Sequence, residues 1–176
     1  MINIGVIGLG LIGGSFALAA KKHFEDAVLF GGDKNTNHIK EAIKKDIIEF
    51  ELKTNNLVKM EVLILAIPVD AASGLVLDLL DKMNDNALLF DVGSTKSSIC
   101  KTVALHPKRN QFLATHPIAG TEFSGPLAAF SDLYVNKTQI LCESEKTRPD
   151  LLEWAIQFFR FMDMNIQEMN PQEHDQ

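Results

Sequence analysis

The sequence of 176 residues is 46% hydrophobic and 23% charged, a composition that fits one soluble globular domain. The net charge is -6, and acidic and basic residues are interleaved without long runs of one sign, which argues against nucleic acid as a partner. The longest apolar runs are much shorter than a membrane span, so we expect no membrane partner and a cytoplasmic location. The two cysteines belong to no CxxC or Cys/His cluster and suggest neither a metal site nor a disulfide framework.

A glycine-rich turn comes directly after the first predicted strand, residues 2–7, and opens a predicted helix over residues 11–22. Its glycines are spaced as GxGxxG: the first allows a tight turn, the second lets backbone approach a pyrophosphate, and the third lets helix and strand pack closely. The free N–H groups and the dipole at the helix start favour an anion, so we expect a dinucleotide diphosphate here. The residues expected to hold it are Gly8, Gly10, Leu11, Ile12 and Gly13.

An acidic residue follows the second apolar run, residues 28–30, which belongs to the predicted strand 28–31. At the tip of this predicted strand, Asp33 can accept hydrogen bonds from the adenosine ribose hydroxyls and would repel a 2′-phosphate, which favours NAD over NADP. The alternative is a solvated turn acid, because residues 33–37 have turn composition. Lys34 and Thr36 could also help to bind a phosphate, so NADP stays open.

Short β-branched runs alternate with amphipathic stretches along the chain, which is the pattern of βαβ units around a parallel sheet. We predict an α/β fold: a Rossmann-type, doubly wound and mostly parallel sheet with helices on both faces. The predicted strands are residues 2–7, 28–31, 62–67, 88–91, 112–115, 138–142 and 166–169. The predicted helices are residues 11–22, 37–45, 71–82, 97–104 and 149–162.

Two stretches break this alternation. Residues 117–135 are long and non-periodic, with polar residues among glycine and proline after a strand end, and we interpret them as a functional loop. Residues 170–176 follow the last predicted strand and stop without any closing element. We therefore expect one domain over residues 1–170 and the start of a linker to a further domain at residues 171–176.

A histidine stands where a ligand would bind, because open α/β sheets bind ligands beyond the carboxyl ends of their strands. His116 ends the predicted strand 112–115 and precedes a proline, so its ring can project into the cleft. A neutral imidazole there could accept a hydroxyl proton while hydride leaves the same carbon. The alternative is a histidine that is hydrogen-bonded locally and supports the loop.

Further polar residues follow the predicted strand 88–91 and lie in the long loop. Ser94 could hydrogen-bond a substrate oxygen or hold His116 in one tautomer, or it could simply cap a helix. We interpret Lys96 as a solvated first-turn residue rather than as a charge in the cleft. Glu122 is either a loop carboxylate in water or an orienting group for the site. No GxSxG elbow is present, which argues against a hydrolase triad.

Four segments together resemble the N-terminal nucleotide-binding domain of the prephenate dehydrogenase family, which includes arogenate-using relatives. Residues 8–15 are similar to the family's cofactor loop, residues 66–69 to its middle strand end, and residues 91–96 to its DxGSxK turn. The most specific match is residues 116–125, His-Pro-Ile-Ala-Gly-Thr-Glu-Phe-Ser-Gly, which are similar to the family's HPxAGxExSG segment. The resemblance extends over essentially the whole chain.

The resemblance implies oxidative decarboxylation of prephenate to 4-hydroxyphenylpyruvate in tyrosine biosynthesis, with hydride passing to NAD and without a metal. It implies that His116 bonds the ring hydroxyl and takes its proton, and that Ser94 assists at the same oxygen. A following helical domain would clamp the substrate carboxylates and form a homodimer. The other site residues implied are Thr121 and Glu122 for the substrate and Ile67 and Pro68 for the cofactor.

The chain has only three arginines, and none lies in a motif at the cleft, although arginine suits a carboxylate. We therefore expect the chain to be the cofactor-binding half of an enzyme, one that binds NAD but by itself turns over prephenate poorly or not at all. Three alternatives stay open: arogenate as the substrate, another NAD(P)-dependent dehydrogenase of the 3-hydroxyacid type, and a non-catalytic NAD-binding module.

Overall fold

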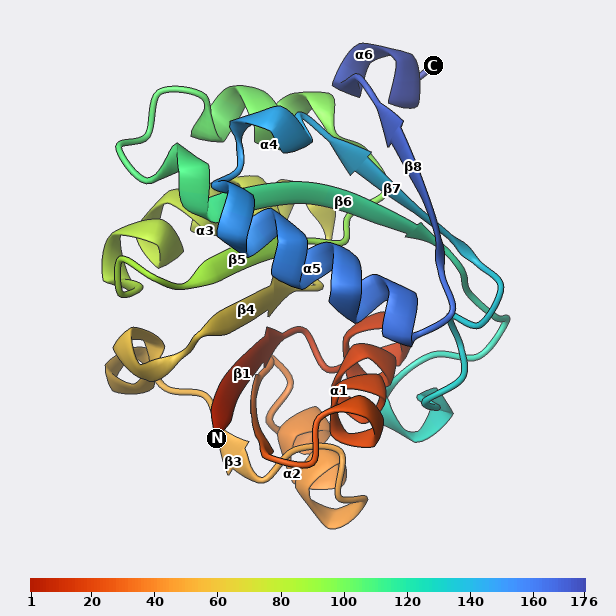
Figure 1. Ribbon diagram of the computed structural model, residues 1–176. Helices are drawn as coiled ribbons and strands as arrows, with labels where there is room; N and C mark the ends of the chain where they lie inside the picture. The colour runs from red at the N-terminus through yellow and green to blue at the C-terminus, as the bar shows by residue number, and fades with distance from the viewer.

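An eight-stranded sheet runs through the centre of the computed structural model, which describes residues 1–176 (Figure 1). The strand order is β3-β2-β1-β4-β5-β6-β7-β8, and all neighbours are parallel except β6 and β7. The predicted α/β fold with a mostly parallel sheet is therefore confirmed. The strands are β1 (Ile2–Ile7), β2 (Ala27–Gly32), β3 (Phe50–Glu51), β4 (Val62–Leu65), β5 (Leu88–Asp91), β6 (Phe112–Ile118), β7 (Thr138–Cys142) and β8 (Asn165–Met169).

Helices cover both faces of this sheet. α1, α2 and α5 pack on one face over a core of 27 buried residues, and α3 and α4 pack on the other over a core of 18. β4 is buried along its whole length because both of its faces are covered, which explains its continuously apolar sequence. None of the helices combines the length and apolar character that crossing a membrane requires. The helices are α1 (Leu11–His23), α2 (Thr36–Lys44), α3 (Val69–Lys82), α4 (Ser97–Val103), α5 (Pro149–Phe161) and α6 (Pro171–His174).

The strand order reverses direction between β1 and β4. From β1 the chain proceeds to β2 and β3 on one side, and then crosses back to β4 on the other. In open α/β sheets such a reversal leaves a crevice at the carboxyl ends of the two strands, and ligands bind there. The fold thus places the end of β1, and the glycine turn that follows it, at the expected binding edge.

β6 continues through Ile118, so His116 lies within the strand and not after its end as predicted. β5 pairs with β6 only as far as Ala114, and the rest of β6 pairs with β7 alone. Pro117 is tolerated because a strand with one neighbour needs no N–H donor on its other side. The antiparallel partner β7 therefore fixes the part of β6 that carries the histidine.

The expectation that the chain stops without a closing element is wrong. Pro171–His174 form the short helix α6, and the Asn170 side chain caps it by accepting a hydrogen bond from the Glu173 N–H at 2.7 Å. An asparagine cap followed by proline is a helix-start signal that the sequence contained. The two-residue strand β3 and the 3-10 helix Thr54–Lys59 were also not predicted, because segments this short leave no periodicity.

Candidate functional site

The turn from β1 into α1 is built around glycines that leave no room for side chains. Gly8 has a φ of 98°, which favours glycine, and a Cβ there would overlap the carbonyl oxygen of Ala66. A Cβ at Gly13 would overlap the carbonyl oxygen of Gly8, so α1 can start this close to the strand only with glycine. Gly10 is the N-cap of α1, has open space at its Cβ position, and leaves the helix without a side-chain cap. The first amides of α1 therefore lack side-chain partners, and an anion can reach them over Gly10.

A cavity of about 760 Å³ opens beside this turn, between the end of β2 and α3. Its size is typical of sites that hold small molecules and cofactors. Part of its wall is apolar and part carries charged side chains, which suits the adenosine half of a dinucleotide next to a diphosphate cradle. The apolar side chains are Leu52, Leu57, Ile67, Leu75 and Leu79, and the polar ones include Asp33, Lys34, Asn35, His38, Lys53 and Lys82.

The structure brings most of the expected cofactor residues together. Gly8, Gly10, Asp33, Ile67 and Pro68 line the cavity. Leu11, Ile12 and Gly13 form the first turn of α1 beside it. Sequence reasoning missed the four leucines of the apolar wall. Two of them, on α3, are four residues apart and thus share one helix face, but that spacing equally predicts core packing.

Asp33 is held at the end of β2 as an ionised carboxylate. Its Oδ2 accepts a hydrogen bond from the Leu9 N–H at 2.8 Å and lies 3.3 Å from His38 Nδ1, while its Oδ1 accepts from the Asn35 N–H at 2.8 Å. Partial burial opposes ionisation, but the hydrogen bonds from the two amides and from His38 outweigh it and hold the pKa of Asp33 below its usual range. The side chain is 11% exposed, so a solvated turn acid does not describe it.

The turn after β5 contains a buried ion pair. The Lys96 ammonium pairs with Asp91 Oδ2 and donates a hydrogen bond to the Thr115 carbonyl oxygen at 2.7 Å, and its side chain is 0% exposed. The interpretation of Lys96 as a solvated first-turn residue is therefore wrong: the side chain turns inward to satisfy a carboxylate and a carbonyl under the turn. Burial raises the pKa of Asp91, and the Lys96 ammonium and the Gly93 amide oppose this rise. The pair thus joins the end of β5 to the middle of β6.

Ser94 lies exposed in this turn and does not cap α4. The hydrogen bonds that cap α4 come instead from the C-terminal segment. Asp175 accepts hydrogen bonds from the Lys96 N–H at 2.7 Å and from the Ser97 N–H at 2.8 Å. The helix-cap interpretation of Ser94 is therefore wrong. Its hydroxyl stays available to a ligand at the carboxyl edge of the sheet.

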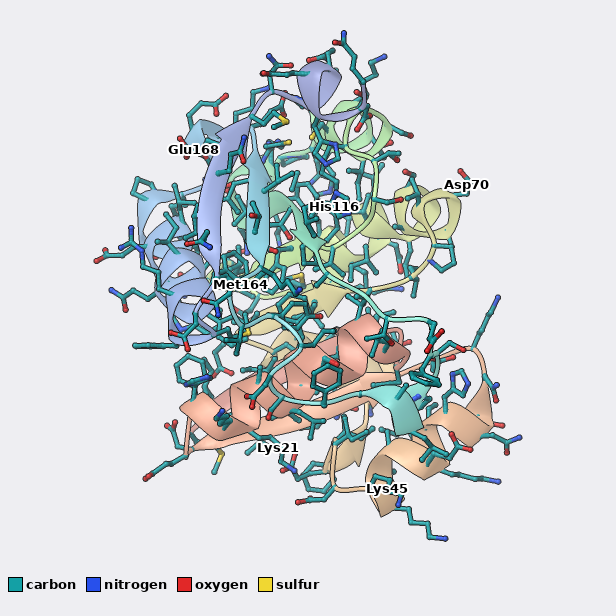
Figure 2. All side chains as sticks on the ribbon, turned by 90° about the vertical axis from the view of Figure 1, so that its right-hand side faces the viewer. Lys21, Lys45, Asp70, His116, Met164 and Glu168 are labelled. Atoms are coloured by element: carbon teal, nitrogen blue, oxygen red, sulfur yellow. The ribbon has the colours of Figure 1, made fainter.

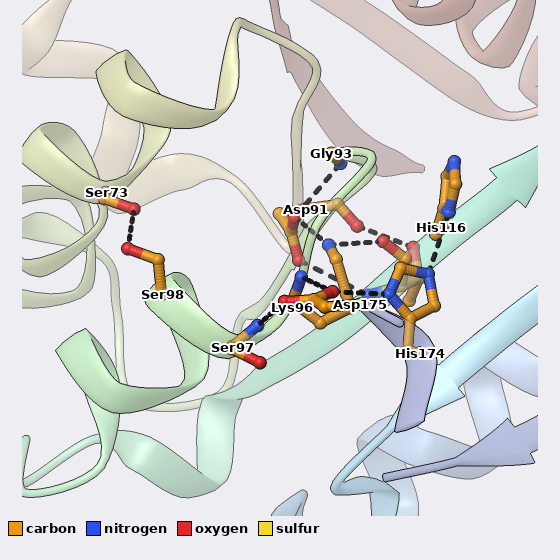
Figure 3. A network of polar contacts seen from close by, with 10 residues as sticks. Ser73, Asp91, Gly93, Lys96, Ser97, Ser98, His116, His174 and Asp175 are labelled. Atoms are coloured by element: carbon orange, nitrogen blue, oxygen red, sulfur yellow. Dashed lines mark hydrogen bonds and ion pairs between the residues drawn. The ribbon is translucent and has the colours of Figure 1, made fainter. Parts of the chain in front are cut away.

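His116 lies half-buried on β6 at the edge where the parallel strands end, which Figure 2 views face on. Its Nδ1 lies 2.9 Å from Nε2 of His174, and the His174 Nδ1 lies 2.7 Å from an Asp175 carboxylate oxygen (Figure 3). Burial, then the His174 ring and the Lys96 ammonium, lower the pKa of His116 to about 4, so its imidazole is uncharged at neutral pH. Sequence reasoning missed His174 and Asp175 because they belong to the segment interpreted as a linker.

The long loop after β6 is tied to the first helix. The Phe130 N–H donates to Ser15 Oγ at 3.1 Å, and the Tyr134 hydroxyl donates to the Ile12 carbonyl oxygen at 2.7 Å. Thr121 and Glu122 are both exposed on this loop, and neither is hydrogen-bonded to His116. The loop that carries the two expected substrate residues is thus anchored on the helix that opens at the glycine turn.

The doubly wound sheet, the glycine turn and the adjoining cavity define the chain as a Rossmann-type domain of the class that binds dinucleotides. The family model described as "Prephenate dehydrogenase, nucleotide-binding domain" matches residues 16–167. The chain belongs to this family.

Relatives agree with this assignment. The chain is 33% identical over 172 residues to the prephenate dehydrogenase of Bacillus subtilis (strain 168), with 96% of the chain and 46% of that protein covered. A Synechocystis arogenate dehydrogenase structure has 25% identity and a TM-score of 0.88, covering 98% of this chain and 61% of that one. The structure of A. aeolicus prephenate dehydrogenase in complex with hydroxyphenyl propionate and NAD+ has 25% identity and a TM-score of 0.85, with 99% of this chain and 62% of that chain covered. The chain thus spans about half the length of the curated relative that it matches.

Proposed function

We propose that the chain is the cofactor-binding part of an NAD-dependent dehydrogenase that converts prephenate to 4-hydroxyphenylpyruvate. The observation that carries this proposal is His116, an uncharged imidazole at the carboxyl edge of the sheet that also holds the glycine turn. The named activity of the Bacillus relative and the ligands of the A. aeolicus complex support the substrate and the cofactor. The cytoplasmic location expected from the sequence stays a prediction.

The glycine turn and the cavity fit NAD, which would supply the hydride acceptor. The amides of Leu11 and Ile12 would bind the diphosphate over Gly10, and Asp33 would accept hydrogen bonds from the adenosine ribose. The apolar wall of leucines would cover the adenine ring and exclude water from it.

His116 would accept the proton of the ring hydroxyl as hydride leaves the same carbon. The ring carbon then becomes a ketone, and carbon dioxide departs from the opposite ring position, leaving its bonding electron pair in the ring. The ring becomes aromatic, and the oxygen that lost its proton is now a phenolate that can take a proton back. Ser94, exposed in the turn after β5, would donate a hydrogen bond to this oxygen. Thr121 and Glu122 would line the substrate site.

Arogenate is the second candidate substrate, supported by the Synechocystis relative. The groups that would separate the two substrates are not evident in this chain. Arg109 donates to the Glu143 carboxylate and to the Phe112 carbonyl, and Arg148 is paired with Asp150. We propose that a following helical domain supplies the carboxylate clamp and forms the homodimer.

The test is reduced-nicotinamide absorbance on the protein extended to its natural stop codon, offered prephenate or arogenate with NAD or NADP. Prephenate-dependent NADH formation is expected. NADH formation from arogenate alone would replace the substrate. No turnover of either compound, by a folded protein that binds NAD, would overturn the proposed reaction.

Cofactor selectivity gives a prediction at Asp33. We expect Asp33→Asn to weaken NAD binding by roughly 10- to 100-fold, because the loss of a charged hydrogen-bond acceptor costs about 1.5–3 kcal/mol. NADP binding should weaken less, since the carboxylate repels its 2′-phosphate. Titration calorimetry with both cofactors measures this change in preference.

The matched control is Asp26→Asn, at the opposite end of β2, where Asp26 is exposed and pairs with the chain amino group. Its cofactor affinities should not change. An equal loss of NAD and NADP affinity in Asp33→Asn would instead mean that the carboxylate only supports the glycine turn through the Leu9 amide.

A further inference from the structure

The end of the chain closes on the proposed catalytic histidine. α6 brings His174 against β6, where its ring meets the His116 ring edge to face with centroids 5.1 Å apart. The His174 side chain is only 4% exposed, although it lies two residues before the last residue. Asp175 anchors this segment by accepting hydrogen bonds from two backbone amides at the start of α4. Figure 3 shows the resulting chain of contacts from Asp175 through His174 to His116.

The negative charge of Asp175 determines which ring nitrogen atoms of His174 and His116 carry a proton. Partial burial opposes ionisation, but the hydrogen bond from His174 and the amides of Ser97 and Lys96 outweigh it and hold the pKa of Asp175 well below its usual range. A carboxylate can only accept, so the proton of a neutral His174 lies on Nδ1 and its Nε2 carries a lone pair. In this tautomer the lone pair can accept the Nδ1–H of His116, since the two nitrogen atoms lie 2.9 Å apart. The Nε2 of His116 then carries no proton, and the only hydrogen-bond contact of this ring within the chain is the one at Nδ1.

We propose that His174 and Asp175 are positioning residues that keep Nε2 of His116 unprotonated and available to the substrate hydroxyl. In this proposal His174 also receives the proton that His116 would otherwise have to hold. The proposal rests on the proposed function. As Nε2 of His116 takes the hydroxyl proton, Nδ1 of His116 passes its own proton to Nε2 of His174. His116 ends neutral, and the positive charge lies on His174 beside the Asp175 carboxylate. The reverse transfers return the proton to the phenolate.

Such a proton transfer explains how His116 can act as a base although its surroundings disfavour a positive charge on its ring. Its surroundings disfavour a positive ring: burial lowers the pKa of His116 most, the His174 ring and the Lys96 ammonium lower it further, and Asp175 opposes them only in part. β7 offers only the apolar Ile140 opposite His116. A general base works best when its pKa lies near the working pH, and that of His116 lies about where a carboxylate's would. Moving the charge to His174, next to a carboxylate, removes the disfavoured imidazolium.

The tautomer can be measured on this chain without any turnover. We expect long-range 1H–15N spectra at pH 8 to show His116 with a protonated Nδ1 and a bare Nε2, the reverse of the tautomer that an isolated histidine side chain prefers. In His174→Ala we expect His116 to revert to the Nε2–H form and its pKa to rise from about 4 toward 6.5. A wild-type spectrum with His116 in the Nε2–H form would overturn the positioning role, whether or not the protein oxidises prephenate.

The relay has its own test in the protein extended to its natural stop codon. His174→Gln can still accept the Nδ1–H of His116 but cannot take up a proton. We therefore expect His116 to keep its tautomer and kcat to fall by up to roughly 10²-fold, the lower end of what a proton-transfer group contributes. An unchanged kcat and pH profile in His174→Gln would overturn the relay. His106→Gln is the control, because the His106 ring lies 2.9 Å from a carboxylate oxygen of Asp81 at another place in the fold. In this variant neither the NMR signals of His116 nor kcat should change.

Discussion

We expect replacement of His116 with alanine to lower the kcat of prephenate oxidation by about 10²–10⁴-fold and to leave the affinity for NAD unchanged, because the role proposed for this side chain is to accept a proton and not to hold the cofactor. The variant is prepared in the protein extended to its natural stop codon. Steady-state NADH absorbance gives kcat, and titration calorimetry gives the affinity for NAD. The effect should exceed that of any change at His174, since the proposed role of His174 is exerted only through its contact with His116.

His106→Ala is the control for this loss, because it removes a histidine with a carboxylate partner at another place in the fold. We expect its kcat to stay near that of the unmodified protein. A His116→Ala variant with near-normal turnover would rule out the proton acceptor. A parallel loss of NAD affinity would show that the ring supports the cofactor site instead.

The glycine turn and the place of Asp33 at the end of β2 could be predicted from the sequence, because both depend on local geometry. Gly8 and Gly13 sit where a Cβ would strike backbone, so their spacing encodes the turn itself. Asp33 follows its strand directly, and the strand end alone places it at the binding edge. Each of these positions is determined by a few neighbouring residues, which is what a sequence pattern can describe.

The residues that the sequence analysis misjudged depend on contacts between distant segments. Lys96 is buried because Asp91 and the Thr115 carbonyl, the latter nineteen positions away, meet it under the turn. His174 is 58 positions from His116 and joins it only through the path of β7, α5 and β8. No spacing rule covers such pairs, although the Asn-Pro start of α6 could have shown that the last residues are folded.

Breaking the buried ion pair between Lys96 and Asp91 is expected to cause the largest change in stability. We expect Lys96→Met to lower the free energy of unfolding by about 3–5 kcal/mol, because it leaves the Asp91 carboxylate buried without its cation. Urea denaturation without cofactor measures the loss. Lys22→Met is the control: Lys22 pairs with Asp132 at 2.7 Å, but both side chains are more than half exposed, so we expect less than about 1 kcal/mol.

The pH dependence of this loss identifies its cause. Without Lys96, the pKa of Asp91 in the folded chain rises further above its ordinary 3.8, since burial is then less opposed. At pH values above 3.8 the folded variant then binds more protons than the unfolded one, so its stability falls as pH rises through this range. The difference between Lys96→Met and the unmodified protein should therefore shrink as pH is lowered. A loss that does not depend on pH would mean that the variant suffers from altered packing and not from an unpaired carboxylate. Adding Asp91→Asn to Lys96→Met should then restore no stability, whereas an unpaired charge predicts partial recovery.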